Sequence, residues 1–185
     1  MKLFILVLWL LALTYSCSAK AQKVDPVKRA NEVNEKKADH KIVDKATAEF
    51  LVKSADARMM DMQEGKLASS RGTTKAVRQY GALMVKDQTM LLSKIRKLAA
   101  SKHISLPAGI SAQKQDGRED LTSKNGKAFD KKFIKMMRID HERDVKIFKK
   151  ASSSNDKEIR MFAIANLPII QSHLDKVNQL REMND

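Results

Sequence analysis

Residues 74–102 read TKAVRQYGALMVKDQTMLLSKIRKLAASK, and the spacing of their apolar side chains decides the fold class. One series of residues steps alternately by four and three positions, which is the period of a buried face on a long α-helix. Its members are Val77, Gly81, Met84, Gln88, Leu91, Ile95 and Leu98. Gln88 is the polar member of this face, so the pattern predicts a buried amide.

Three further segments have helical character, and they cover residues 44–70, 126–151 and 155–180. Asp44 or Thr47 is a suitable N-cap for the first segment. Asn155 and Glu158 have capping-box spacing at the start of the last segment. The chain has only 6 Gly and 3 Pro in 185 residues, which favours long helices in a single domain.

The connections between these segments differ in length, and this difference predicts the topology. The first and last breaks are a few residues long, which requires antiparallel hairpins. The middle connection, residues 103–125, has about 20 residues and can span a helix of roughly 40 Å. Two hairpins joined by one long crossover form the ferritin-like arrangement. We therefore expect an all-α, ferritin-like four-helix bundle over residues 44–185.

The N-terminus has the pattern of a secretory signal peptide. Lys2 precedes an apolar run from Leu3 to Leu13, which is too short to span a membrane as a helix. Cleavage after Ala21 would give a signal peptide of residues 1–21, whereas a lipoprotein signal of residues 1–16 would leave an acylated Cys17. Both routes stay open. The polar residues 22–43 are expected to form a flexible tether.

The charge of the chain predicts its partners. The formal net charge is +14, and removal of Lys2 and Lys20 with the signal peptide would leave +12. Such a charge favours anionic envelope polymers or lipid headgroups at a membrane surface. Export makes nucleic acid an unsuitable partner. We expect a periplasmic or outer-membrane location, with a lipid anchor if Cys17 is acylated.

Each predicted helix places a polar side chain where its buried face should be apolar. These side chains are Asp61, Gln88, His141 and His173. On the first helix two series compete for the buried face, one with Asp61 and Glu64 and the other with Met59 and Met62. Converging polar groups inside a bundle form either a metal site or a hydrogen-bonded core network. The metal reading gives a transition metal the ligands Asp61, His141 and His173, and the network reading needs no cofactor.

Enzymatic chemistry has little support in the sequence. A ferritin-like di-iron site uses Glu-x-x-His pairs, and none of the four histidines has a Glu three residues before it. The only cysteine, Cys17, precedes the expected bundle, and no serine has the surroundings of an activated nucleophile. We expect a protein that is not an enzyme.

Several short segments together resemble the DUF4142 family, a ferritin-like group of exported bacterial proteins of unknown function that are often labelled outer membrane proteins. They are EFL at 49–51, EGKLA at 64–68, MVKD at 84–87, SLP at 105–107, FD at 129–130, DH at 140–141, LP at 167–168 and HL at 173–174. The family pattern has a Glu where this chain has Asp61 and a His where it has Gln88, while His141 and His173 match. The resemblance thus implies that any metal site of the family is altered or lost here.

Three functions follow as hypotheses. The first is a non-enzymatic helical bundle in the cell envelope that serves stress tolerance or envelope integrity. The second is a ferritin-like metal-binding protein with a degenerate site. The third is a cationic module that binds anionic envelope polymers or lipid headgroups through the basic face of residues 126–151.

Overall fold

The computed structural model describes residues 24–183, which form six α-helices and no strand. The helices are α1 (Pro26–Asp39), α2 (Lys45–Arg71), α3 (Lys75–Ser101), α4 (Ala112–Ser123), α5 (Gly126–Ala151) and α6 (Lys157–Glu182). The all-α prediction is confirmed. The expectation of four helices is wrong for this part of the chain, because α1 and α4 are two additional helices.

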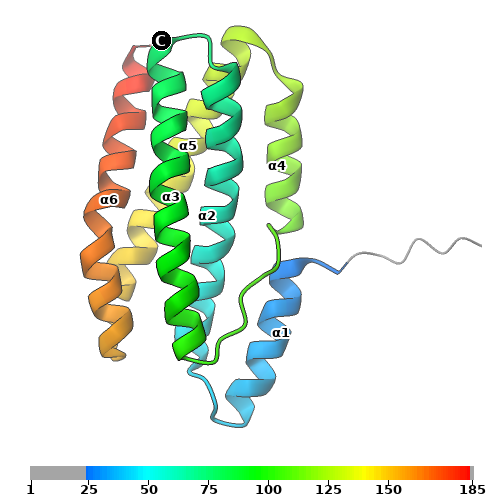
Figure 1. Cartoon of the computed structure of the whole chain (residues 1–185), viewed down its shortest axis with the longest axis vertical. Coiled ribbons are helices and arrows are strands. Elements are labelled where there is room, and N and C mark those ends of the chain that lie inside the picture. Colours follow the sequence, from blue (N-terminus) through cyan, green and yellow to red (C-terminus); the bar gives the residue numbers. More distant parts are fainter. Residues whose placement is uncertain (1–23, 184–185) are drawn as a thin grey trace, which may run out of the picture.

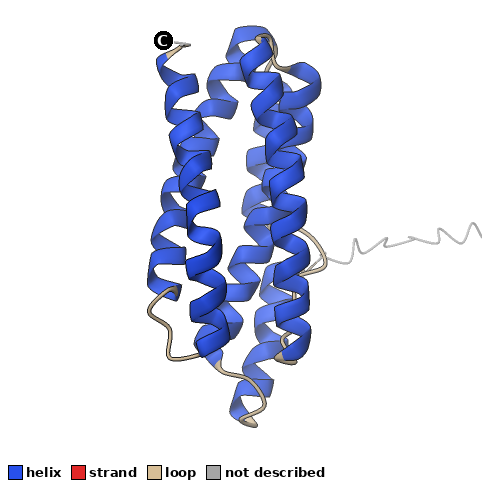
Figure 2. Ribbon diagram, turned by 60° about the vertical axis from the view of Figure 1, so that its left-hand side comes forward, coloured by secondary structure: helices blue, strands red, loops and turns tan. Residues whose placement is uncertain are grey.

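The four long helices, α2, α3, α5 and α6, lie side by side along a common axis (Figures 1 and 2). The most extensive packing joins α2 to α3 and α5 to α6, and further contacts join α2 to α5 and α3 to α6. In Figure 1, α2 and α6 run upward while α3 and α5 run downward. The connection between α3 and α5 returns along the bundle, and α4 forms its second half.

The helix starts follow from side-chain caps. Asp44 accepts a hydrogen bond from the N–H of Thr47, and Thr74 accepts one from the N–H of Val77. At α6 the N-cap is Asp156, whose carboxylate accepts from two N–H groups of the first turn. The expectation that Asn155 opens this helix is therefore wrong by one residue, and a carboxylate is also the better partner for the positive end of a helix.

Two glycines allow α2 and α3 to pack at close range. A Cβ placed on Gly65 would lie 2.8 Å from the carbonyl oxygen of Gly81, and one placed on Gly81 would lie 2.6 Å from the backbone nitrogen of Ser69. No side chain fits between these backbones. The pair of glycines sets the spacing of the first hairpin.

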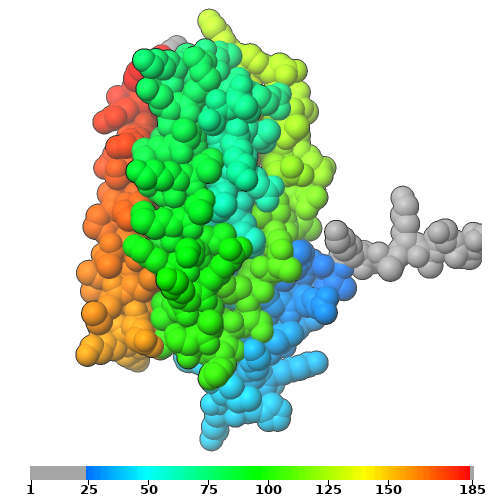
Figure 3. All heavy atoms as spheres, in the orientation of Figure 1, coloured from blue at the N-terminus to red at the C-terminus, as the bar shows by residue number. Residues whose placement is uncertain are grey.

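The segment expected to be a flexible tether, residues 22–43, contains helix α1 over Pro26–Asp39, so that expectation is corrected there. The amide of Asn34 both donates to the carbonyl oxygen of Ser105 and accepts from its N–H, at 2.8 Å each. Figure 3 shows α1 packed at one end of the molecule against the connection that follows α3. Long-range hydrogen bonds thus hold a segment whose composition is polar.

The expected signal peptide, with Cys17, lies outside the described residues. Within residues 24–183, no helix combines the length and the apolar character that crossing a bilayer requires.

The core divides into two apolar clusters, one toward each end of the bundle. One cluster includes Phe50 and Phe148, and the other includes Phe129 and Phe133. On each long helix the residues of the two clusters are separated by a short stretch of chain. The polar residues of the next section lie in these stretches, so they form a layer at mid-height.

Candidate metal centre

A layer of polar side chains crosses the middle of the bundle with almost no exposure to solvent. We call it the polar layer, and its members are Arg58, Asp61, Glu64, Gln88, His141, Asp144 and His173. All four long helices contribute to it. The four residues expected on buried faces, Asp61, Gln88, His141 and His173, are each at most 1% exposed. Their predicted burial is therefore confirmed.

On α2, at the height of the polar layer, the series that contains Asp61 and Glu64 is the more deeply buried one. Both side chains are 0% exposed, whereas Met59 and Met62 of the competing series are only partly buried. Because residues three apart on a helix share a face, Arg58, Asp61 and Glu64 all project into the same layer.

The two histidines of the layer lie against each other. Their rings stack with centroids 5.4 Å apart and 24° between the planes. Nε2 of His173 lies 3.2 Å from Oδ2 of Asp87, and the Tyr80 hydroxyl donates to the backbone carbonyl of His173. Burial lowers the pKa of His173, although the nearby Asp87 opposes this. The imidazole of His173 thus contacts the carboxylate of Asp87, which is on α3.

Possible ligand atoms form two groups that share Asp61. One group is Asp61, His141 and Asp144, and the other is Asp61, Glu64 and Asp140. Within each group one ligand atom per residue lies within 4.8 Å of the others. Opposite ligands of a small divalent cation are about 4.2 Å apart, so slight side-chain movement would suffice for coordination. Of the expected ligands, Asp61 and His141 are brought together, while His173 lies beside His141 outside both groups.

Arg58 supplies a positive charge to the first of these groups. Its Nη2 lies 3.1 Å from Oδ2 of Asp61 and also pairs with Asp144. Arginine stays protonated in proteins. The guanidinium therefore fills the position between these two carboxylates that a cation would otherwise take.

Glu64 has no such partner. Neither of its carboxylate oxygens has a hydrogen-bond partner within the described chain, although both are buried. Burial raises the pKa of Glu64 well above its ordinary value of 4.5, and the charges of Asp61 and Asp140 add to the effect. Without a neighbouring cation this carboxyl group therefore favours its neutral form.

His141 has the protonation state that a ligand needs. Burial lowers the pKa of its imidazole well below the ordinary value of 6.5, and the positive charge of Arg58 adds to the effect. The two ring nitrogens are buried and have no hydrogen-bond partner among residues 24–183. The ring is neutral at physiological pH, so one of its nitrogens carries a hydrogen and the other is free to accept.

Gln88 lies in the same layer but offers a weaker ligand. Its Nε2 makes a long contact of 3.9 Å to the sulfur of Met84, and its buried Oε1 has no partner in the described residues. An amide oxygen is a poor ligand for most transition metals. Gln88 is not a member of either ligand group.

Four members of the layer and its rim were missed as site residues in the sequence, namely Arg58, Glu64, Asp140 and Asp144. A Glu-x-x-His motif places its two ligands three residues apart with the Glu first. Asp61 with Glu64 and His141 with Asp144 have the same three-residue spacing, but their residue types or their order differ. The three-residue spacing of polar side chains, whatever their order, was therefore the signal in the sequence.

Comparison with known proteins adds the family alone. The family model described as Domain of unknown function (DUF4142) matches residues 32–180. Neither the curated proteins nor the solved structures contain a match to this chain.

Proposed function

Since the chain belongs to the DUF4142 family, a domain of unknown function, we propose from the geometry of the polar layer that it binds one divalent metal ion. The ion is held by the carboxylates of Asp61, Glu64 and Asp140. The observation that carries the proposal is the side chain of Glu64, which is fully buried and lacks a hydrogen-bond partner in the described part of the chain. Its oxygen faces those of two other carboxylates within 4.8 Å. A buried carboxylate without a partner is costly, and a cation removes that cost.

The charges of the ligand carboxylates and of the two arginines that pair with them support a single ion. They are four carboxylates and two guanidiniums, those of Asp61, Glu64, Asp140, Asp144, Arg58 and Arg143. With every carboxylate ionised, two negative charges remain, and one divalent cation balances them. Arg58 takes the position on the Asp144 side, so the ion belongs on the Glu64 side.

The ligand types favour a cation that prefers oxygen. Carboxylates suit Mg²⁺, Ca²⁺ and Mn²⁺, while imidazole suits later transition metals. His141 lies on the other side of Asp61, where Arg58 already pairs with the carboxylates. Mn²⁺ therefore fits the proposed ligand set better than Zn²⁺ or Cu²⁺.

We also propose that the four long helices form a ferritin-like bundle, and the order of the helices supports this. Two packed hairpins, α2 with α3 and α5 with α6, are joined by a connection that returns along the bundle. The centre differs from a di-iron site in that an arginine takes one of the two cation positions.

The test is Mn²⁺ binding to the untagged protein at pH 7, measured by electron paramagnetic resonance of the free ion. We expect one equivalent to bind to the natural chain and none to bind tightly to Glu64→Gln. Glu49→Gln is the matched control, because Glu49 is also on α2 but is half exposed and pairs with Lys53. Failure of the natural chain to bind Mn²⁺, or equal binding by Glu64→Gln, would refute the proposal.

We also propose that the protein acts in the cell envelope, as residues 1–21 and the positive charge predict. The mass of the mature protein tests this location, because each processing route leaves a different N-terminus. An acylated Cys17 indicates a lipoprotein, a free Gln22 indicates ordinary cleavage, and an intact Met1 contradicts export.

A further inference from the structure

The ion proposed above lies next to a pocket of about 390 Å³. Residues of α2, of α5 and of the start of α4 form its walls, and Asp140 is one of them. Asp140 also belongs to the ligand group with Asp61 and Glu64. Its side chain is 15% exposed, whereas Asp61 and Glu64 are fully buried. The pocket thus reaches the metal group on the side of Asp140.

The pocket has the size and walls of a small-molecule site. Pockets for small ligands start at about 300 Å³ and combine apolar walls with a few charged groups. Its apolar side chains are Met60, Met136, Ile139 and Ile147. A volume of this size is more than ten times the share of one water molecule, which is about 30 Å³.

Basic side chains line the same pocket, and Lys114 is one of them. Within residues 24–183 the side chain of Lys114 has no ion pair or hydrogen bond. Lys53 and Arg143 also line the pocket, and each pairs with a carboxylate of its own helix.

Coordination chemistry leaves room for a further ligand. A small divalent cation prefers six ligands, and three carboxylates binding through one oxygen each fill half of them. The buried side of the ion is closed by the bundle, whereas Asp140 borders the pocket. Open positions therefore face the pocket, where lysine and arginine favour a negative charge.

We propose that this pocket binds a small organic carboxylate whose charged end completes the coordination of the metal ion beside Lys114. The proposal rests on the proposed function, because it requires the ion. The apolar walls take the hydrocarbon part of the molecule, and the charge selects the ionised acid over a neutral analogue.

The test uses the full chain loaded with Co²⁺, whose visible absorption reports its ligands, and butyrate as the probe. Butyrate is expected to change the spectrum in a saturable way, while the neutral butyramide leaves it unchanged. Lys114→Ala should raise the half-saturating concentration about three- to fivefold, as expected for loss of one partly exposed charge. Lys149→Ala, an exposed lysine of α5 outside the pocket, is the matched control and should have no effect.

The outcomes separate the two proposals. If Co²⁺ binds and butyrate leaves its spectrum unchanged, the pocket proposal is overturned and the metal site stands. Equal effects of Lys114→Ala and Lys149→Ala would also overturn the pocket proposal. If the chain does not bind Co²⁺ at the layer, both proposals fail together.

Discussion

The guanidinium of Arg58 lies 3.1 Å from Oδ2 of Asp61, and both side chains are fully buried at mid-height in the bundle. The same guanidinium pairs with Asp144 on α5. Arg58 therefore joins α2 to α5 and balances one of the two carboxylate charges on its side of the polar layer. Glu64, on the other side, has no such partner among the described residues, and its carboxyl group favours the neutral form until a cation binds.

Replacing Arg58 with Met should destabilise the metal-free protein and increase the stabilisation that it gains from bound metal. Removing one partner of a buried ion pair costs about 3–5 kcal/mol, because Asp61 and Asp144 stay buried without compensation. Urea denaturation measures this loss, and Mn²⁺ should restore more stability to Arg58→Met than to the natural chain. Arg96→Met, an exposed arginine on α3, is the control. If Mn²⁺ did not restore the stability of Arg58→Met, the idea that a metal ion can take over the charge-balancing role of Arg58 would be contradicted.

Glu64 should make the stability of the metal-free protein fall as pH rises. Its pKa in the folded protein is raised, so the folded state binds more protons than the unfolded state above pH 4.5. The free energy of unfolding then falls with a slope of at most about 1.4 kcal/mol per pH unit, until the pH exceeds the folded pKa. Urea denaturation between pH 5 and pH 8 should show this fall in the natural chain and a smaller one in Glu64→Gln. Equal slopes for the two proteins would show that Glu64 is not the group responsible.

Periodicity predicted the burial of Gln88, His141 and His173 because each interrupts an apolar face, while for Asp61 it left two competing faces of the first long helix open. It could not predict Arg58 or Asp144, because a charged residue on a helix is exposed unless a partner from another helix pairs with it. That partner lies 86 residues away for Arg58, a relationship that only the folded chain shows. Local pattern therefore predicts which faces are buried, and tertiary pairing decides which charges join them.

The same limit explains the error at α1. Its residues are polar, and composition alone indicates a tether. The helix is held by the hydrogen bonds between Asn34 and Ser105, which are 71 residues apart. Asn34 is 3% exposed despite its polar side chain.

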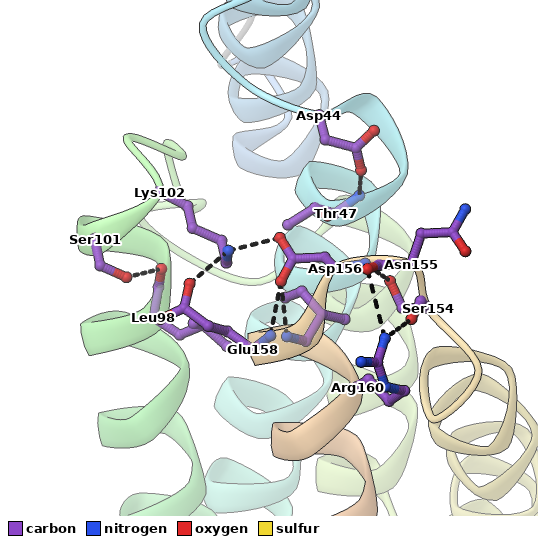
Figure 4. Close-up of polar contacts among 11 residues, drawn as sticks. Asp44, Thr47, Leu98, Ser101, Lys102, Ser154, Asn155, Asp156, Glu158 and Arg160 are labelled. Carbon is purple, nitrogen blue, oxygen red and sulfur yellow. Dashed lines mark hydrogen bonds and ion pairs between the residues drawn. The ribbon is translucent and has the colours of Figure 1, made fainter.

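Asp156 should stabilise the end of the bundle where α3 meets α6. Its carboxylate caps α6 and lies 2.6 Å from Nζ of Lys102, the C-cap residue of α3 (Figure 4). Asp156→Ala should lower the free energy of unfolding by about 1–2 kcal/mol through loss of the cap. Asp156→Asn keeps a capping oxygen and should lose less, and thermal denaturation of both variants measures the difference. Equal losses would mean that the cap contributes nothing.

The contribution of Asp156 should disappear in acid. Burial alone would raise its pKa, but the hydrogen bonds from Lys102 and from the first turn of α6 hold it below the ordinary value of 3.8. A group with a lowered folded pKa stabilises the protein above its unfolded pKa, and that contribution is lost as the pH falls through the folded value. The gap in stability between the natural chain and Asp156→Asn should therefore be full at pH 6 and shrink below pH 3.8. A gap that grew on acidification would contradict the sign of the shift.

Gly81→Ala should destabilise the first hairpin, because the space for a side chain at Gly81 is already filled by backbone. An added Cβ would lie 2.7 Å from the carbonyl oxygen of Gly65 and 2.6 Å from the nitrogen of Ser69, so α2 and α3 must move apart. Overpacking of this kind costs about 1–3 kcal/mol.

Gly117→Ala is the matched control inside helix α4, where the added Cβ meets only the end of Met136 at 3.5 Å. Alanine there should stabilise the helix by about 0.5–1 kcal/mol through its higher helix propensity. Opposite signs in the urea midpoints of the two variants are thus expected, and a stabilising Gly81→Ala would show that the backbones are not packed as closely as described. Met84 of the apolar cluster with Phe129 and Phe133, and Gln88 of the polar layer, follow Gly81 on the same helix face. Separation of the hairpin should therefore also weaken Mn²⁺ binding in Gly81→Ala but not in Gly117→Ala.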